Sequence, residues 1–143
     1  MTSKLFIDSD VVIDFFTDRK PFANSASELF ELNEKGKVQL YLSAVSINNI
    51  YYIVRKYLGH KQAIKIIEEL TEMTKIAGTT RKEIIQGLKS GFKDFEDSIQ
   101  YSTALAIGGI EAIITRNTKD YINSQIAVLT PTDFLKAQNK KIN

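Results

Sequence analysis

The stretch Leu5-Phe6-Ile7-Asp8 decides the fold that we predict from this sequence. Three consecutive apolar residues are typical of a strand that is buried on both faces, as strands of parallel sheets are. The run stops at Asp8-Ser9-Asp10, and residues 11–16 resume an apolar pattern. A carboxylate at the end of a buried strand is costly to desolvate, and ligands of open α/β sheets bind at that end. We therefore expect Asp8 to anchor a divalent-metal site.

Composition limits the possible classes of protein. The chain has 143 residues, enough for one domain with a sizeable core, and its net charge of +2 neither requires nor excludes a nucleic-acid partner. The absence of cysteine excludes disulfides and thiolate metal sites. Residues 1–4 lead into the first strand without a signal-peptide layout, and no apolar run approaches the ~20 residues that cross a bilayer. We expect a cytoplasmic protein that does not enter the membrane.

Apolar periodicity alternates between strand-like and helix-like patterns along the chain. Strands are predicted at residues 5–8, 38–42, 75–78, 111–115 and 126–129, and helices at 11–17, 22–35, 44–57, 60–73, 81–90, 98–107 and 132–137. This alternation favours an α/β fold, a three-layer α/β/α arrangement with a mainly parallel five-stranded sheet. We expect residues 1–138 to form this single domain and residues 139–143 to form a loose tail.

Polar segments fall just after or beside these predicted strands. Because the carboxyl ends of parallel strands share one edge of the sheet, their side chains should meet there. The candidates at this edge are Asp8, Ser9, Asn49, Asp94, Asp97, Thr115, Arg116, Asn117 and Asp120. Clustered carboxylates repel one another unless a cation neutralises them, and oxygen ligands without His or Cys suit Mg²⁺ or Mn²⁺. Such an ion lowers the pKa of a bound water and holds a phosphodiester for attack.

Each candidate also has a purely structural interpretation. Asp8 could simply cap the following helix. Asp94 and Glu96 precede a predicted helix, where acids favour the positive end of the dipole. Asp120 could be a turn residue and Arg116 a surface charge. The sequence alone leaves these alternatives open.

Four segments together resemble the PIN-domain family. The first is residues 6–14, an apolar strand, an acid, a small hydroxyl residue and an apolar helix. The others are residues 42–49, residues 97–104 with an acid seven positions before an alanine, and residues 114–121 followed by residues 128–131. The resemblance covers nearly the whole chain. Because the four segments also occur in the right order and spacing, it is fairly specific.

The resemblance implies strand order 3-2-1-4-5, Mg²⁺ or Mn²⁺, and cleavage of RNA, as in the toxins of many bacterial toxin–antitoxin pairs. Asp8 and Asp97 match the family's first and third acids, so they are the implied metal ligands and, with Asp120, the implied catalytic residues. Asn49 stands where the family usually has a glutamate, and Asn117 stands where many members have a fourth acid. The implied site therefore carries less negative charge than is usual in the family.

Three functions follow as hypotheses. The first is a Mg²⁺- or Mn²⁺-dependent endoribonuclease, in which Thr115 or Ser9 holds a water or phosphate and Arg116 contacts the RNA backbone. Its expected partners are RNA, an inhibitory antitoxin protein and a second copy of the chain. The second is an inactive RNA-binding or protein-interaction module, suggested by Asn49 and Asn117.

The third hypothesis is an aspartate-nucleophile phosphatase. Residues 6–12 also match a hydrophobic-Asp-x-Asp opening, with Asp8 as nucleophile and Asp10 as acid or base. Such an enzyme needs further acids after a strand that ends in Thr or Ser. Here the sequence that follows Thr115 is short and offers few positions for them. In the nuclease interpretation, Asp10 instead faces the rim of the site or caps a helix.

Overall fold

The computed structural model describes residues 2–142, with side chains through residue 140. Its strands are β1 (Ser3–Ile7), β2 (Val38–Ser43), β3 (Lys75–Ala77), β4 (Ile110–Ile114) and β5 (Ala127–Leu129). Its helices are α1 (Ser9–Phe16), α2 (Ala23–Glu34), α3 (Ala44–Leu58), α4 (His60–Met73), α5 (Arg81–Lys89), α6 (Phe95–Ile107) and α7 (Pro131–Ile142), with a 3-10 turn η1 (Thr118–Tyr121). Every predicted strand and helix is present, with boundaries that shift by a few residues.

The five strands form one parallel sheet with β1 at its centre. The strand order is β3-β2-β1-β4-β5, and all four pairings are parallel. Phe6 of β1 pairs with Tyr41 of β2 on one side and with Ile113 of β4 on the other. This confirms the predicted α/β class and the order 3-2-1-4-5. The carboxyl ends of β1, β2 and β4 consequently lie at one edge.

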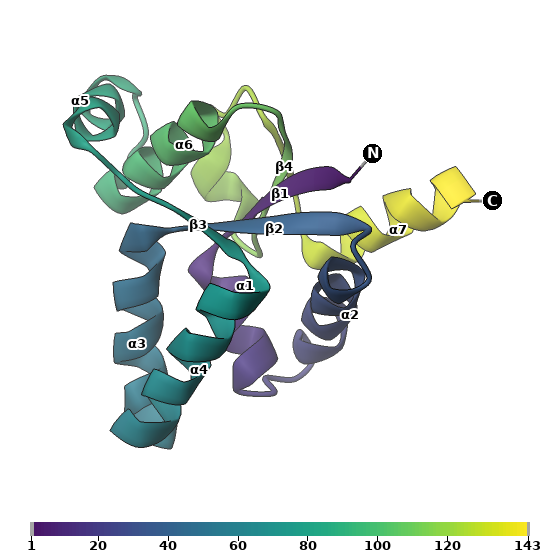
Figure 1. Ribbon diagram of the computed structural model, residues 1–143. Coiled ribbons are helices and arrows are strands. Elements are labelled where there is room, and N and C mark those ends of the chain that lie inside the picture. The colour runs from purple at the N-terminus through teal and green to yellow at the C-terminus, as the bar shows by residue number, and fades with distance from the viewer. Residues whose placement is uncertain (1, 143) are drawn as a thin grey trace.

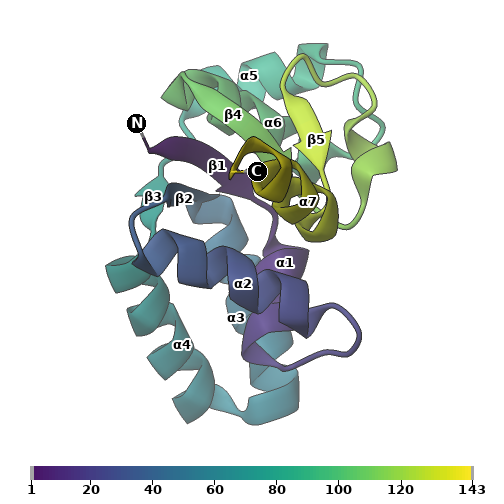
Figure 2. The ribbon, with the colours of Figure 1, turned by 90° about the vertical axis from the view of Figure 1, so that its right-hand side faces the viewer.

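Helices cover both faces of the sheet (Figure 1). The helices α5 and α6 lie on one face, and α1 to α4 with α7 lie on the other, as the two views of the ribbon show (Figures 1 and 2). Successive residues of β1 enter different cores. Leu5 and Ile7 join the larger core, and Phe6 joins a smaller one with Tyr101 of α6 and Tyr121 of η1. All three β1 residues are fully buried, as predicted for a strand covered on both faces.

The start of α6 differs from the prediction. The helix begins at Phe95, whereas the sequence predicts a start at residue 98. Asp94 is the N-cap, and its Oδ1 accepts the backbone N–H of Asp97 at 3.0 Å. This cap satisfies one of the free donors at the helix start, and acids are favoured there. The acidic step is therefore the first turn of the helix and not a loop that precedes it.

The end of α7 also differs from the prediction. The sequence predicts a helix that ends at residue 137 and a loose tail at 139–143, but α7 continues to Ile142. No Gly or Pro follows Pro131 in this stretch, and Lys140 lies near the carboxyl end, where the dipole favours a cation. The predicted domain start at residue 1 and the end of the predicted tail at residue 143 lie outside the described residues. Within residues 2–142, no helix has both the length and the apolar character that crossing a membrane requires.

Candidate active site

A cavity of about 210 Å³ opens at the carboxyl edge of the sheet, between α1, α3, α6 and the loop after β4. Five acidic side chains line it, namely Asp8, Asp10, Glu96, Asp97 and Asp120. Ser9, Asn49 and Asn117 line it as well. The polar segments that the sequence places at this edge are therefore brought together by the fold.

Asp8 both caps α1 and lines the cavity. Its Oδ1 accepts the backbone N–H of Ser9 at 2.8 Å, which is the N-cap bond of α1. Its Oδ2 accepts the hydroxyl of Thr115 at 2.9 Å and the hydroxyl of Tyr121 at 3.4 Å. Burial raises the pKa of Asp8, although these hydrogen bonds oppose the shift. The capping interpretation and the site interpretation are thus compatible.

Asp10 lines the cavity from the first turn of α1, and the helix cap, which was the other role expected for it, is formed by Asp8. Its Oδ2 accepts the backbone N–H of Arg116 at 3.0 Å and the side-chain amide of Asn117 at 3.3 Å. Its Oδ1 is buried and has no hydrogen-bond partner within the described residues. Burial, together with the charge of Asp8, raises the pKa of Asp10 to about 6. Asp10 therefore fixes the loop after β4 and leaves one carboxylate oxygen available.

The first turn of α6 supplies the acids on the opposite wall. Partial burial, followed by repulsion from Asp8, Asp94 and other acids, raises the pKa of Asp97 to about 7. Burial and the charges of Asp8 and Asp94 also raise the pKa of Glu96. Neighbouring acids that raise one another's pKa by repulsion are characteristic of sites that bind a cation.

Asn49 of α3 connects the two walls. Its side-chain amide donates to Ser9 Oγ and to Glu96 Oε1, each at 3.3 Å. One turn earlier on α3, the Ser46 hydroxyl donates to Gln100 Oε1 of α6 at 3.0 Å, and both residues are buried. These bonds hold α3 against α6 beside the cavity. In this arrangement the Asn49 amide acts as a hydrogen-bond donor to an acid.

Arg116 is held by a buried carboxylate. Its Nε lies 2.6 Å from Asp14 Oδ2, and its second guanidinium nitrogen donates to Asp14 Oδ1 at 3.2 Å. The guanidinium also lies 4.2 Å from the ring centroid of Phe22. Such a bidentate pair is strong and directional. It fastens the loop after β4 to α1, so that the Arg116 N–H and the Thr115 hydroxyl point at the acids.

The comparisons with known proteins agree with this geometry. A family model described as PIN domain matches residues 4–119. The chain belongs to the PIN domain family. Ribonuclease VapC1 of Aquifex aeolicus is 27% identical over 143 residues, and the alignment covers 96% of this chain and 97% of that protein.

Solved structures share the PIN domain fold. A toxin–antitoxin complex from Klebsiella pneumoniae superposes with a TM-score of 0.66 at 24% identity, covering 90% of this chain and 98% of that chain. A DNA-bound VapBC from Salmonella typhimurium superposes with a TM-score of 0.68 at 13% identity, covering 91% and 99%. At these identities the likeness confirms the fold and carries no statement about activity.

The donor set of this PIN domain suits a hard divalent cation. The cavity offers carboxylate and amide oxygens, including the unpartnered Oδ1 of Asp10. Among the His, Asp and Glu residues of positions 2–142, no group of three is arranged to hold a metal ion. Mg²⁺ usually keeps several waters and needs only one or two protein carboxylates. The residues therefore fit such an ion, with Asp8 and Asp97 as the expected ligands.

The sequence prediction missed three residues around the PIN domain site, namely Asp14, Gln100 and Tyr121, and it gave Asp10 only a place at the rim or as a helix cap. Asp10 and Asp14 are four residues apart in an apolar helix, so they share one face, and this spacing was a usable signal. Gln100 stands among small residues and carries no distinctive pattern. Tyr121 follows Asp120 in the segment that resembles the family, but its bond to Asp8 requires the fold.

Proposed function

We propose that this PIN domain is a Mg²⁺- or Mn²⁺-dependent endoribonuclease that hydrolyses phosphodiesters of single-stranded RNA. The observation that carries the proposal is the cavity at the carboxyl edge of the sheet, with five acidic side chains on its walls. The relative named Ribonuclease VapC1, aligned over nearly the full length of both chains, supports the same activity. Because the chain belongs to the PIN domain family, we do not retain the phosphatase alternative.

In this proposal Asp8 and Asp97 hold the divalent ion, and Asp120 assists from the mouth of the cavity. When bound, the ion lowers the pKa of a water and neutralises charge on the phosphodiester. Thr115 keeps the Asp8 carboxylate in place through its hydrogen bond to Oδ2. Ser9 presents its hydroxyl to the cavity, where it can contact a water or a phosphate oxygen.

Arg116 has a different role from the RNA contact that the sequence suggests. Its guanidinium is paired with Asp14 and stacked on Phe22. The side chain is therefore committed to the protein, and we assign it to positioning the loop that carries Thr115 and Asn117.

The test is RNA cleavage by purified protein with Mn²⁺. The parent should cleave single-stranded RNA, EDTA should stop cleavage, and Mn²⁺ should restore it. Asp8→Asn and Asp97→Asn should each lower the rate by more than roughly 100-fold, because loss of a ligand costs more than loss of a supporting residue. Asp133→Asn is the matched control, since Asp133 is an exposed acid in the first turn of α7. Cleavage by Asp8→Asn at the parent's rate would show that the site is wrongly assigned.

A second candidate is a PIN domain that binds RNA or protein without cutting. The observation that favours it is the hydrogen bonding of the two amides at the site, since Asn49 donates to Glu96 and Asn117 donates to Asp10. These contacts satisfy carboxylate oxygens without a metal ion. Calorimetric titration with Mn²⁺ distinguishes the candidates. Tight binding together with RNA turnover supports the nuclease, whereas the absence of both supports the inactive module.

We further propose that the protein acts as the toxin of a toxin–antitoxin pair in the cytoplasm. The structural neighbours from Klebsiella pneumoniae and Salmonella typhimurium, described as a toxin–antitoxin complex and as VapBC, support an inhibitory protein partner. A homodimer is the expected assembly, as the family resemblance implies.

A further inference from the structure

A second hollow adjoins the acidic cavity and is larger, at about 720 Å³. It runs between α1 and α3 toward the carboxyl ends of both helices. Asp10 and Ile13 of α1 and Ile53 of α3 line both hollows, so the two are continuous. The larger hollow, hereafter the α1–α3 groove, is therefore an extension of the proposed active site.

The wall that α3 gives to the α1–α3 groove is aromatic and apolar. Tyr57 and Leu58 line it, and they are 73% and 44% exposed. Tyr57 is four residues beyond Ile53, which places it about 6 Å further along the helix axis from the acidic cavity. Large apolar side chains in a hollow beside a candidate site indicate a ligand-binding surface. A tyrosine ring offers a face on which any nucleobase can stack.

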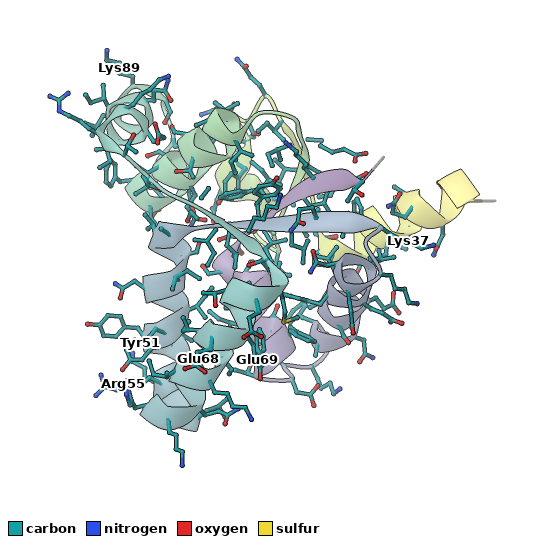
Figure 3. The ribbon with its side chains drawn as sticks, viewed as in Figure 1. Lys37, Tyr51, Arg55, Glu68, Glu69 and Lys89 are labelled. Carbon is teal, nitrogen blue, oxygen red and sulfur yellow. The ribbon has the colours of Figure 1, made fainter. Side chains whose placement is uncertain are left out.

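The opposite wall of the α1–α3 groove is cationic. Arg19 lines it, with its guanidinium 5.8 Å from the ring centroid of Phe22. Within residues 2–142 Arg19 forms no ion pair, whereas the nearby Arg116 is neutralised by Asp14. Figure 3 shows Arg55 projecting from the outer side of α3, so the positive charge of this helix end extends beyond the groove. The Arg19 guanidinium and the Tyr57 ring, which line the same groove, together suit a phosphate and its base.

We propose that the α1–α3 groove binds the nucleotide next to the scissile phosphate of a single-stranded RNA, with its base on Tyr57 and its phosphate near Arg19. The inference rests on the proposed ribonuclease function, because continuity with the acidic cavity identifies the occupant. A volume of about 720 Å³ lies within the range of small-ligand pockets and accommodates one nucleotide. A purely apolar protein segment would leave the charge of Arg19 without a partner.

The test is binding of a fluorescein-labelled decauridylate to the full chain, measured by anisotropy in Ca²⁺ with the RNA checked for integrity on a gel. Tyr57→Ala should weaken binding roughly tenfold, whereas Tyr57→Phe should stay within about twofold of the parent because the ring is kept. Arg19→Ala should lower the slope of log K against log salt by about 0.7, the loss of one phosphate contact. Tyr52→Ala is the matched control, since Tyr52 is 55% exposed on the same helix and lines neither hollow. Equal melting temperatures of the variants confirm that all of them fold.

Cleavage with Mn²⁺ is measured in parallel and separates the two proposals. If the parent cleaves RNA but Tyr57→Ala and Arg19→Ala bind like the parent, the nucleotide site is wrong, the nuclease stands, and the groove is left to a protein segment. If the parent does not cleave but Tyr57→Ala still weakens binding, the nuclease is wrong, and the groove is a nucleotide-binding site of an RNA-binding module. An equal loss of affinity in Tyr52→Ala would also overturn the nucleotide site, because the effect would not be specific to the groove.

Discussion

The Asp14–Arg116 ion pair shows how a single buried residue organises the candidate site. Asp14 is almost fully buried, and both of its carboxylate oxygens are bound by the guanidinium. Arg116 is also the residue whose backbone N–H donates to Asp10, and it follows Thr115 directly. The hydrogen bond from the Thr115 hydroxyl to Asp8 therefore depends on the Asp14–Arg116 ion pair, which lies outside the cavity.

Breaking this pair should cost stability as well as activity. Arg116→Ala leaves the Asp14 carboxylate buried without a partner, and we expect the free energy of unfolding to fall by about 3 kcal/mol. Urea denaturation followed by circular dichroism measures the change. The double variant Asp14→Leu with Arg116→Met should lose less, because both charges are removed together and no buried charge is left without a partner. A loss below about 0.5 kcal/mol in Arg116→Ala would contradict the assignment of a stabilising pair.

The residues that the sequence alone could identify are those at strand ends. Asp8 and Thr115 end apolar runs, so their places at the carboxyl edge follow from the strand pattern. Asp14 could not be found in this way, because a buried charge is recognised by its partner. That partner, Arg116, lies in a loop whose contact with α1 requires the folded sheet. Asp10 could be placed near the site, but its bond to the backbone of that loop could not be predicted from the sequence.

At the scale of elements, helix and strand types were predictable because the apolar periodicity is strong. Local capping signals were also readable: Ser43 caps α3, and Thr80 forms a capping box with Glu83 at the start of α5. The start of α6 was placed too late because Asp94 reads equally well as a loop acid and as an N-cap. The strand order came from the family resemblance, since β3 has only three residues and its own pattern is weak.

Gly87 in the middle of α5 has no explanation in the sequence, but the structure provides one. A Cβ at this position would lie 2.8 Å from Ser98 Oγ and 2.9 Å from Ile99 Cγ2 of α6. Both of these residues are buried. The absence of a side chain therefore allows α5 to pack closely on the helix that carries Asp97.

We expect Gly87→Ala to destabilise the protein by about 1–3 kcal/mol, since overpacking at the α5–α6 contact outweighs the better helix propensity of alanine. Thermal and urea unfolding measure the effect. Gln86→Ala on the exposed side of the same helix is the control and should stay within about 0.5 kcal/mol of the parent. A Gly87→Ala variant that is more stable than the parent would show that α5 can move without cost.

At the scale of the whole molecule, charge is distributed unevenly. The chain has a net charge of +2, yet one sheet edge collects Asp8, Asp10, Glu96, Asp97 and Asp120. Folding brings these acids together and partly desolvates them, so the acidic site opposes folding when its groups are ionised. A bound divalent cation removes this penalty by neutralising the acids. The site is therefore assembled at some expense of stability in the metal-free protein.

This penalty makes the stability of the metal-free protein depend on pH. The pKa values of Asp97 and Asp10 rise to about 7 and about 6 in the folded state, above their ordinary value of 3.8. The folded state then binds more protons than the unfolded state, so stability decreases as pH increases through this range. In EDTA, the melting temperature should fall between about pH 4 and pH 7, and Asp97→Asn should flatten the profile and melt higher at pH 8. Mn²⁺ at pH 8 should raise the melting temperature of the parent more than that of Asp97→Asn, because binding to the folded state stabilises it. A parent whose metal-free melting temperature increases from pH 4 to pH 7 would contradict the raised pKa values. Equal shifts with Mn²⁺ in both proteins would remove Asp97 from the metal site.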